Sequence, residues 1–151
     1  MNEILLYKIG GKAQFLIDVE GKNDVKRAYE FLKNEKVKRV FILGLGSNLI
    51  FTDDYFNGAV IRFLAGKVPV RLVKPNMVEA AAGAMLDDVI KFALEHNLAG
   101  LEWAGGLPGN VGAAIAGNVG AFGGEVKDSV KQAEVFEAVN GKPRFKSLKR
   151  F

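Results

Sequence analysis

The chain has 151 residues, of which 49% are apolar and 25% are charged. This balance is typical of a folded globular protein and excludes a disordered one. The absence of cysteine excludes disulfide bridges, thiolate metal sites and a cysteine nucleophile. The one histidine, His96, excludes a site built mainly of histidines. The residues therefore predict no metal site.

The net charge of +4 raises the question of nucleic-acid binding. Gly141–Phe151 holds five of the 21 bases and no acid, so 16 bases and 17 acids remain in the rest of the chain. The rest is nearly neutral, and the basic segment is interpreted as a solvated terminus. We expect no nucleic-acid partner. Met1–Gly11 lacks a signal-peptide pattern, so the expected location is the cytoplasm.

Hydrophobic periodicity predicts strands separated by two helices. The predicted strands are Ala13–Val19, Arg39–Leu43, Ala59–Phe63, Pro69–Val73, Val78–Ala82 and one within Ser129–Val139, with a strand-like run at Leu49–Phe51. The first helix is expected to begin at Asn23 as its N-cap, and the second to span Met85–His96. The excess of strands over helices and their short spacing predict an α+β fold.

Glycine is the most informative imbalance. Nine of the 18 glycines fall in Gly100–Gly124, where Glu102 is the only charged residue. Trp103–Gly124 is 22 uncharged residues, long enough to cross a bilayer. Its eight glycines and Pro108 make it too poor in large apolar residues for a membrane helix. We expect no membrane partner.

A first glycine-rich segment, Gly44–Asn48, follows a predicted strand. The dinucleotide fingerprint G-x-G-x-x-G fails because Leu49 stands at the sixth position, and no P-loop motif is present. Backbone N–H groups, with the Ser47 hydroxyl and the Asn48 amide, could still donate to phosphate oxygens. The alternative is a plain turn, which this segment alone favours.

The second glycine-rich segment, Gly105–Gly124, contains a short helix-capable stretch, Ala113–Ala116. A chain this poor in side chains can bring its backbone against a flat, bulky ligand. The alternative is close backbone packing between two lobes. We favour contact with a ligand.

Four stretches resemble the UDP-N-acetylenolpyruvoylglucosamine reductases, flavoenzymes of peptidoglycan precursor synthesis. They are YKIGGKAQFLID (Tyr7–Asp18), LGLGSNLIF (Leu43–Phe51), FNGAVIRF (Phe56–Phe63) and the long run Ala80–Val126. The sequence departs from the family at Leu45 and Ala113, where glycine is usual, and at Phe122, where tyrosine is usual.

The resemblance implies a two-lobed FAD-binding fold of the vanillyl-alcohol-oxidase type, with lobes at 1–65 and 66–151 and noncovalent FAD. It implies the following FAD-binding residues: Gly44, Leu45, Gly46, Ser47, Asn48, Ala82, Gly83, Leu107, Pro108, Gly109, Val111, Gly112, Asn118, Gly120, Ala121 and Gly123. In the family NADPH is the hydride donor. The substrate-binding domain, with the family's catalytic residues, would follow Phe151 and is absent, so no catalytic residue is assigned. A UDP-sugar substrate is expected only with that domain.

The charged residues near these segments are given other roles. We expect Asp87 and Asp88 to be solvated or to cap a helix, Glu102 to orient a loop through backbone amides, and His96 to be structural. Arg62 faces either a phosphate or solvent.

Two alternatives to an FAD-binding part of the reductase remain open. One is a flavin-dependent oxidase or dehydrogenase of the same fold, and the other is a noncatalytic flavin- or nucleotide-binding module that associates with another chain.

Overall fold

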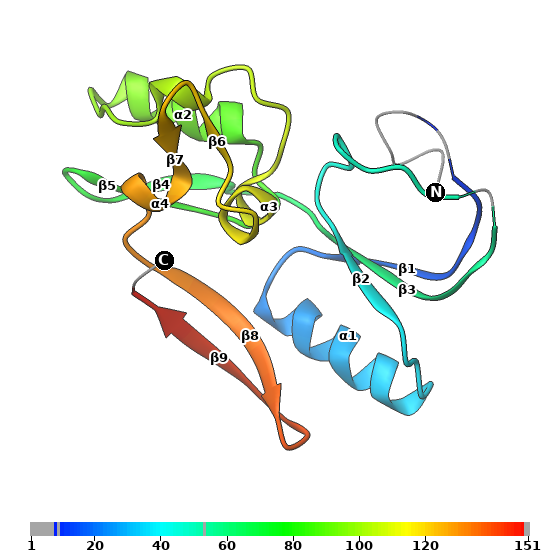
Figure 1. Ribbon diagram of the computed structural model, residues 1–151. Coiled ribbons are helices and arrows are strands. Elements are labelled where there is room, and N and C mark those ends of the chain that lie inside the picture. Colours follow the sequence, from blue (N-terminus) through cyan, green and yellow to red (C-terminus); the bar gives the residue numbers. More distant parts are fainter. Residues whose placement is uncertain (1–7, 9, 53, 150–151) are drawn as a thin grey trace.

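The computed structural model describes residues 8, 10–52 and 54–149. In chain order, the elements are β1 (Ala13–Val19), α1 (Lys22–Asn34), β2 (Val40–Leu43), β3 (Phe56–Phe63), β4 (Val70–Lys74), β5 (Met77–Ala80), α2 (Leu86–Glu95), η1 (Glu102–Ala104), α3 (Val111–Ala116), β6 (Gly120–Ala121), β7 (Gly124–Glu125), α4 (Val126–Ser129), β8 (Ala133–Val139) and β9 (Lys142–Leu148). We call β1–β3 with α1 the parallel unit, and β4–β9 with the remaining helices the antiparallel part. The two lie on opposite sides of the molecule, except that the β8–β9 hairpin runs beside α1 (Figure 1).

The parallel unit is a three-stranded sheet in the order β1-β3-β2, and both strand pairs are parallel. Helix α1 packs on one face through Ala28 and Leu32, both buried. The other face carries a small apolar cluster around Leu43 and Val60. Parallel strands place their carboxyl ends at the same edge of a sheet, where ligands of such sheets commonly bind. The segment after Leu43 leaves the sheet at that edge.

The antiparallel part contains three separate two-stranded sheets, β4-β5, β6-β7 and β8-β9. Apolar residues recur at helical spacing along one face of α2, and this face packs against α3 and α4 to form the core. The buried members are Leu86, Ile90, Ala104, Ala114 and Val126. Among the described residues, no helix has the length and hydropathy needed to cross a membrane.

Most predicted elements are confirmed to within about two residues at each end, and the mixed α and β fold is confirmed. The predicted N-cap Asn23 is wrong, because α1 begins at Lys22 with Gly21 as its N-cap. The first-turn carboxylate of Asp24 instead accepts a hydrogen bond from the Glu20 N–H at 3.1 Å.

Two further predictions are corrected. Leu49–Phe51 is not a strand: Leu49 and Phe51 pack against the Leu43–Val60 cluster from irregular backbone, so their hydrophobicity reflects burial. The basic segment is not a solvated tail, since Lys142–Leu148 pairs with β8 along its whole length. Lys142, Arg144 and Lys146 are exposed on a strand whose backbone is paired. The lobe boundary after residue 65 remains a prediction.

Candidate functional site

A cavity of about 260 Å³ lies where the carboxyl end of β2 meets the loop before α3. The residues that line it are Phe41, Ile42, Leu43, Gly44, Leu45, Gly46, Ser47, Asn48, Leu49, Leu86, Leu107, Pro108, Gly109, Ala113, Ala114 and Val119. The two walls come from segments about sixty residues apart in the chain, one from the parallel unit and one from the antiparallel part. The fold thus brings together the two glycine-rich segments found in the sequence.

The two walls are joined directly. The Ser47 hydroxyl donates a hydrogen bond to the Pro108 carbonyl oxygen at 2.7 Å. A Cβ atom on Gly44 would lie 2.7 Å from the Cβ of Ala113, closer than real side chains approach. Gly44 is therefore needed for the close packing of the end of β2 against α3. Gly83 and Gly112 are explained in the same way, by close backbone at Leu64 and Ala82.

Four backbone N–H groups of the Gly44–Asn48 loop, which lines the cavity, have no hydrogen-bond partner among the described residues. Gly46 has a φ of 71°, a left-handed conformation that glycine adopts without strain. No hydrogen bond joins the backbone N–H groups of Leu45, Gly46, Ser47 or Asn48 to another described residue. Adjacent free N–H groups in a tight loop form a binding concavity for anions such as a diphosphate.

Among the glycines that line the cavity, Gly109 is explained neither by close packing nor by a left-handed backbone. It lines the cavity, a Cβ there would meet nothing within 4 Å, and its φ is not in the left-handed region. A side chain at this position would occupy the cavity itself. The wall is therefore bare backbone, which suits a flat ligand that packs against it.

Eight of the predicted site residues lie outside this cavity: Ala82, Gly83, Val111, Gly112, Asn118, Gly120, Ala121 and Gly123. Both polar ends of the Asn118 side chain are engaged within the protein. Its amide nitrogen donates to Glu125 at 2.9 Å, and its oxygen accepts from the Lys127 N–H at 3.1 Å. The hydrogen bond from the Lys127 side chain holds the pKa of Glu125 below its usual range. Asn118 thus holds the chain where β6 begins.

Several lining residues were not predicted: Phe41, Ile42, Leu43, Leu49, Leu86, Ala113, Ala114 and Val119. They are apolar, and nothing in the sequence separates an apolar cavity wall from a core. Asn110 was also missed. It is 5% exposed, and its side-chain oxygen accepts the Ala113 N–H at 3.0 Å, which makes it the N-cap of α3.

The nearby acidic residues hold loops. The Asp87 carboxylate accepts the Gly106 N–H at 3.0 Å, which corrects its expected role as a solvated or helix-capping residue. Glu102 accepts the Gly100 N–H at 2.8 Å, which confirms the expectation that it orients a loop. Backbone hydrogen bonds from its own N–H and from Gly100 lower the pKa of Glu102.

Arg62 has a protein partner that neither alternative named, and its side chain stays partly exposed to solvent. Its guanidinium makes two hydrogen bonds to Asp18, at 2.8 and 2.7 Å, across the β1–β3 pair. His96 ends α2, with Nδ1 at 2.8 Å from the Phe92 carbonyl oxygen and its ring stacked on Phe92. His96 is thus in a structural position, as expected.

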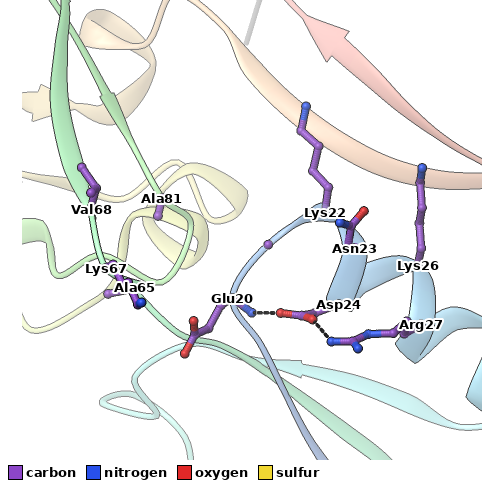
Figure 2. Close-up of a pocket in the computed structure, with 12 residues that line it drawn as sticks. Glu20, Lys22, Asn23, Asp24, Lys26, Arg27, Ala65, Lys67, Val68 and Ala81 are labelled. Carbon is purple, nitrogen blue, oxygen red and sulfur yellow. Dashed lines mark hydrogen bonds and ion pairs between the residues drawn. The ribbon is translucent and has the colours of Figure 1, made fainter.

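A second, larger hollow of about 1080 Å³ lies between the start of α1 and the segment Ala65–Val68. Its bases do not converge on one point (Figure 2). Arg27 is paired with Asp24, and Lys22 extends toward the β8–β9 hairpin to meet Glu134. The smaller cavity, with its bare wall and free N–H groups, is therefore the better candidate site.

A parallel sheet with a glycine-rich loop at its carboxyl edge is an arrangement typical of proteins that bind phosphate-containing nucleotide cofactors. The protein-family model described as "FAD binding domain" matches residues 13–144 of the chain. The chain belongs to this FAD-binding domain family.

Two relatives and one solved structure show which FAD-binding proteins the chain resembles. The chain is 36% identical over 137 residues to the UDP-N-acetylenolpyruvoylglucosamine reductase of Caldicellulosiruptor bescii, covering 91% of this chain and 43% of that protein. It is 34% identical to the reductase of Orientia tsutsugamushi strain Boryong, covering 97% and 49%. The crystal structure of the Thermus caldophilus reductase superposes with a TM-score of 0.77 at 30% identity, covering 98% of this chain and 50% of that one. The chain thus spans about half the length of these relatives and matches their FAD-binding portion.

Proposed function

We propose that this chain is the FAD-binding part of an NADPH-dependent UDP-N-acetylenolpyruvoylglucosamine reductase, which makes UDP-N-acetylmuramate for peptidoglycan in the cytoplasm. The observation that carries the proposal is the cavity between the two glycine-rich segments, with free N–H groups on one wall and bare backbone at Gly109 on the other. Its volume of about 260 Å³ accommodates part of a dinucleotide.

The residues of the cavity suit the parts of FAD. The N–H groups of Leu45–Asn48 would donate to the diphosphate, and Ile42, Leu107 and Pro108 would pack against its flat rings. The eight predicted residues outside the cavity would lie further along the cofactor. When bound, the flavin supplies the hydride chemistry, and the protein supplies orientation and electrostatics.

None of the sixteen residues that line the cavity is ionisable. General acid catalysis needs a titratable group at the reacting centre. The cavity therefore supplies groups that could hold the cofactor but no general acid, and we expect substrate protonation by residues elsewhere in a full-length reductase. We expect the chain alone to bind FAD but not to reduce the sugar nucleotide.

A glycine pair tests the proposal. Gly109→Ala places a methyl group in the cavity, where nothing else is displaced, and is expected to weaken FAD binding about tenfold, or about 1.4 kcal/mol. Gly21→Ala is the matched control, because Gly21 has equal space and extended backbone but lies outside this cavity. Both variants should keep the melting temperature within about 3 °C of wild type. Titration with FAD, followed by flavin fluorescence, measures the affinity. A wild-type chain that binds no FAD contradicts the proposal, as does Gly109→Ala with unchanged affinity.

The lack of an ionisable group also favours a second candidate, a flavin-binding module that catalyses nothing. Anaerobic addition of NADPH to the FAD-loaded protein separates the two. Bleaching of the flavin absorbance supports the reductase, and its absence with FAD bound supports the module.

A further inference from the structure

The β8–β9 hairpin pairs with no other strand in the described part of the chain. Its turn, Asn140-Gly141, has φ values of 51° and 72°, the left-handed pair of a tight hairpin turn. An isolated two-stranded hairpin is marginally stable in water, so its position depends on contacts with a neighbour. Helix α1, from the other side of the molecule, is that neighbour (Figure 1).

Three kinds of contact join the hairpin to α1. Lys22 forms an ion pair with Glu134 at 2.7 Å. The Tyr29 hydroxyl donates to the Gly141 carbonyl oxygen at 3.3 Å, and the Tyr29 ring lies 5.6 Å from that of Phe136. These contacts run along the whole of β8, from Glu134 near its start to Gly141 in the hairpin turn.

Two lysines of α1 also face one aromatic ring. The Nζ atoms of Lys22 and Lys26 lie 5.5 and 5.8 Å from the centre of the Phe145 ring. Figure 2 shows both side chains leaving α1 toward the strands of the hairpin, away from Lys67. The Lys22 and Glu134 side chains are 62% and 43% exposed, so solvent and salt weaken the attraction between them.

We infer that the β8–β9 hairpin is an electrostatic strap, which holds the parallel unit against the antiparallel part and slows the escape of a bound dinucleotide. One wall of the cavity belongs to each of these parts, so their separation opens it. The strap fastens α1 at a distance from the cavity and contributes none of its lining residues. This inference rests on the proposed binding of FAD.

Charge reversal tests the strap. Lys22→Glu and Glu134→Lys each place like charges together, and the double variant restores an opposite-charge pair. Each single variant should release FAD about fivefold faster, and the double variant should return to within about twofold of wild type. Stopped-flow displacement of bound FAD measures the rate. Lys146→Glu is the control, because Lys146 pairs with Val135, which alternation along β8 puts on the face opposite Glu134 and Phe136.

A second measurement follows the strap itself. Because the chain has no cysteine, spin labels can be placed at Lys33→Cys on α1 and at Lys142→Cys on β9, whose partner Val139 lies on the face opposite Glu134. The distance distribution should broaden in each single variant and narrow again in the double variant. Unchanged distances, or FAD release at one rate in all four proteins, overturn the strap alone. A wild-type chain that takes up no FAD overturns the proposed function, and the label distances then still show whether the hairpin detaches.

Discussion

Phe122 occupies a backbone conformation that suits other residues better. It has a φ of 50°, next to Gly123 at 85°, in the turn between β6 and β7, and its side chain is 90% exposed. A residue with a Cβ atom loses about 1 kcal/mol or more in this left-handed region, while asparagine and glycine adopt it readily. The exposed ring recovers none of that loss within the described part of the chain.

Replacement of Phe122 by asparagine should therefore stabilise the protein by about 0.5–1 kcal/mol. Urea denaturation measures the change, and Phe122→Ala is the control, since it removes the ring but keeps the Cβ atom. Equal stability of the two variants would contradict the argument from strain.

The Asp18–Arg62 pair makes stability depend on pH. The hydrogen bonds from Arg62 hold the pKa of Asp18 below its usual range, and the same contact raises the pKa of Arg62. Because the folded carboxyl has the lower pKa, its contribution is fully present above the ordinary value of about 4 and is lost as the pH falls through the folded value.

Asp18→Asn should cost about 1 kcal/mol or less at pH 7, because both groups remain partly exposed to solvent. Its stability should also fall less than that of wild type between pH 5 and pH 2. Urea midpoints at a series of pH values measure both effects. Glu79→Gln, which breaks the more exposed Arg71 pair, should cost less. A wild type and an Asp18→Asn variant with parallel pH profiles would argue against the pair.

At the scale of elements, the stability of α3 depends on its N-cap residue more than on the length of the helix. The helix has six residues, too few for stability without tertiary support, and its N-cap Asn110 is buried. It also carries Ala113 and Ala114 of the cavity wall. The capping hydrogen bond therefore supports both the helix and the candidate site.

Asn110→Ala should destabilise the protein by about 1 kcal/mol and weaken FAD binding, while Asn110→Ser keeps a capping oxygen and should lose less of both. Thermal melts and FAD titrations of the two variants provide the measurement. A loss of equal size in both would show that packing of the asparagine, and not its hydrogen bond, supports α3.

The whole molecule shows what the sequence could and could not predict. Strands such as Ala13–Val19 and the helix of Leu86–Glu95 follow from local periodicity, and the two glycine-rich segments each supply one wall of the cavity. The Ser47–Pro108 bond and the Asp87–Gly106 bond join residues whose proximity depends on the complete fold. Local patterns carry no information about such contacts, and the same holds for the partner of Arg62.

Amide hydrogen exchange should distinguish the buried centre of the parallel sheet from the β8–β9 hairpin. Ala59 and Val60 of β3 are fully buried between two paired strands, so their amides should exchange most slowly. The β8–β9 hairpin, held by exposed contacts, should exchange faster. Protection of the hairpin equal to that of β3 would show that its contacts with α1 are stronger than their exposure indicates.

The order β1-β3-β2 has a consequence for synthesis on the ribosome. The middle strand of the sheet is the last of the three to be translated, and β1 and β2 pair with nothing else in the described part of the chain. Until Phe63 has left the ribosomal exit tunnel, the apolar strands β1 and β2 have no strand to pair with. Helix α1, which lies between them in the sequence, can already form. Nascent chains stalled before β3 should therefore be the ones that chaperones bind and proteases cut.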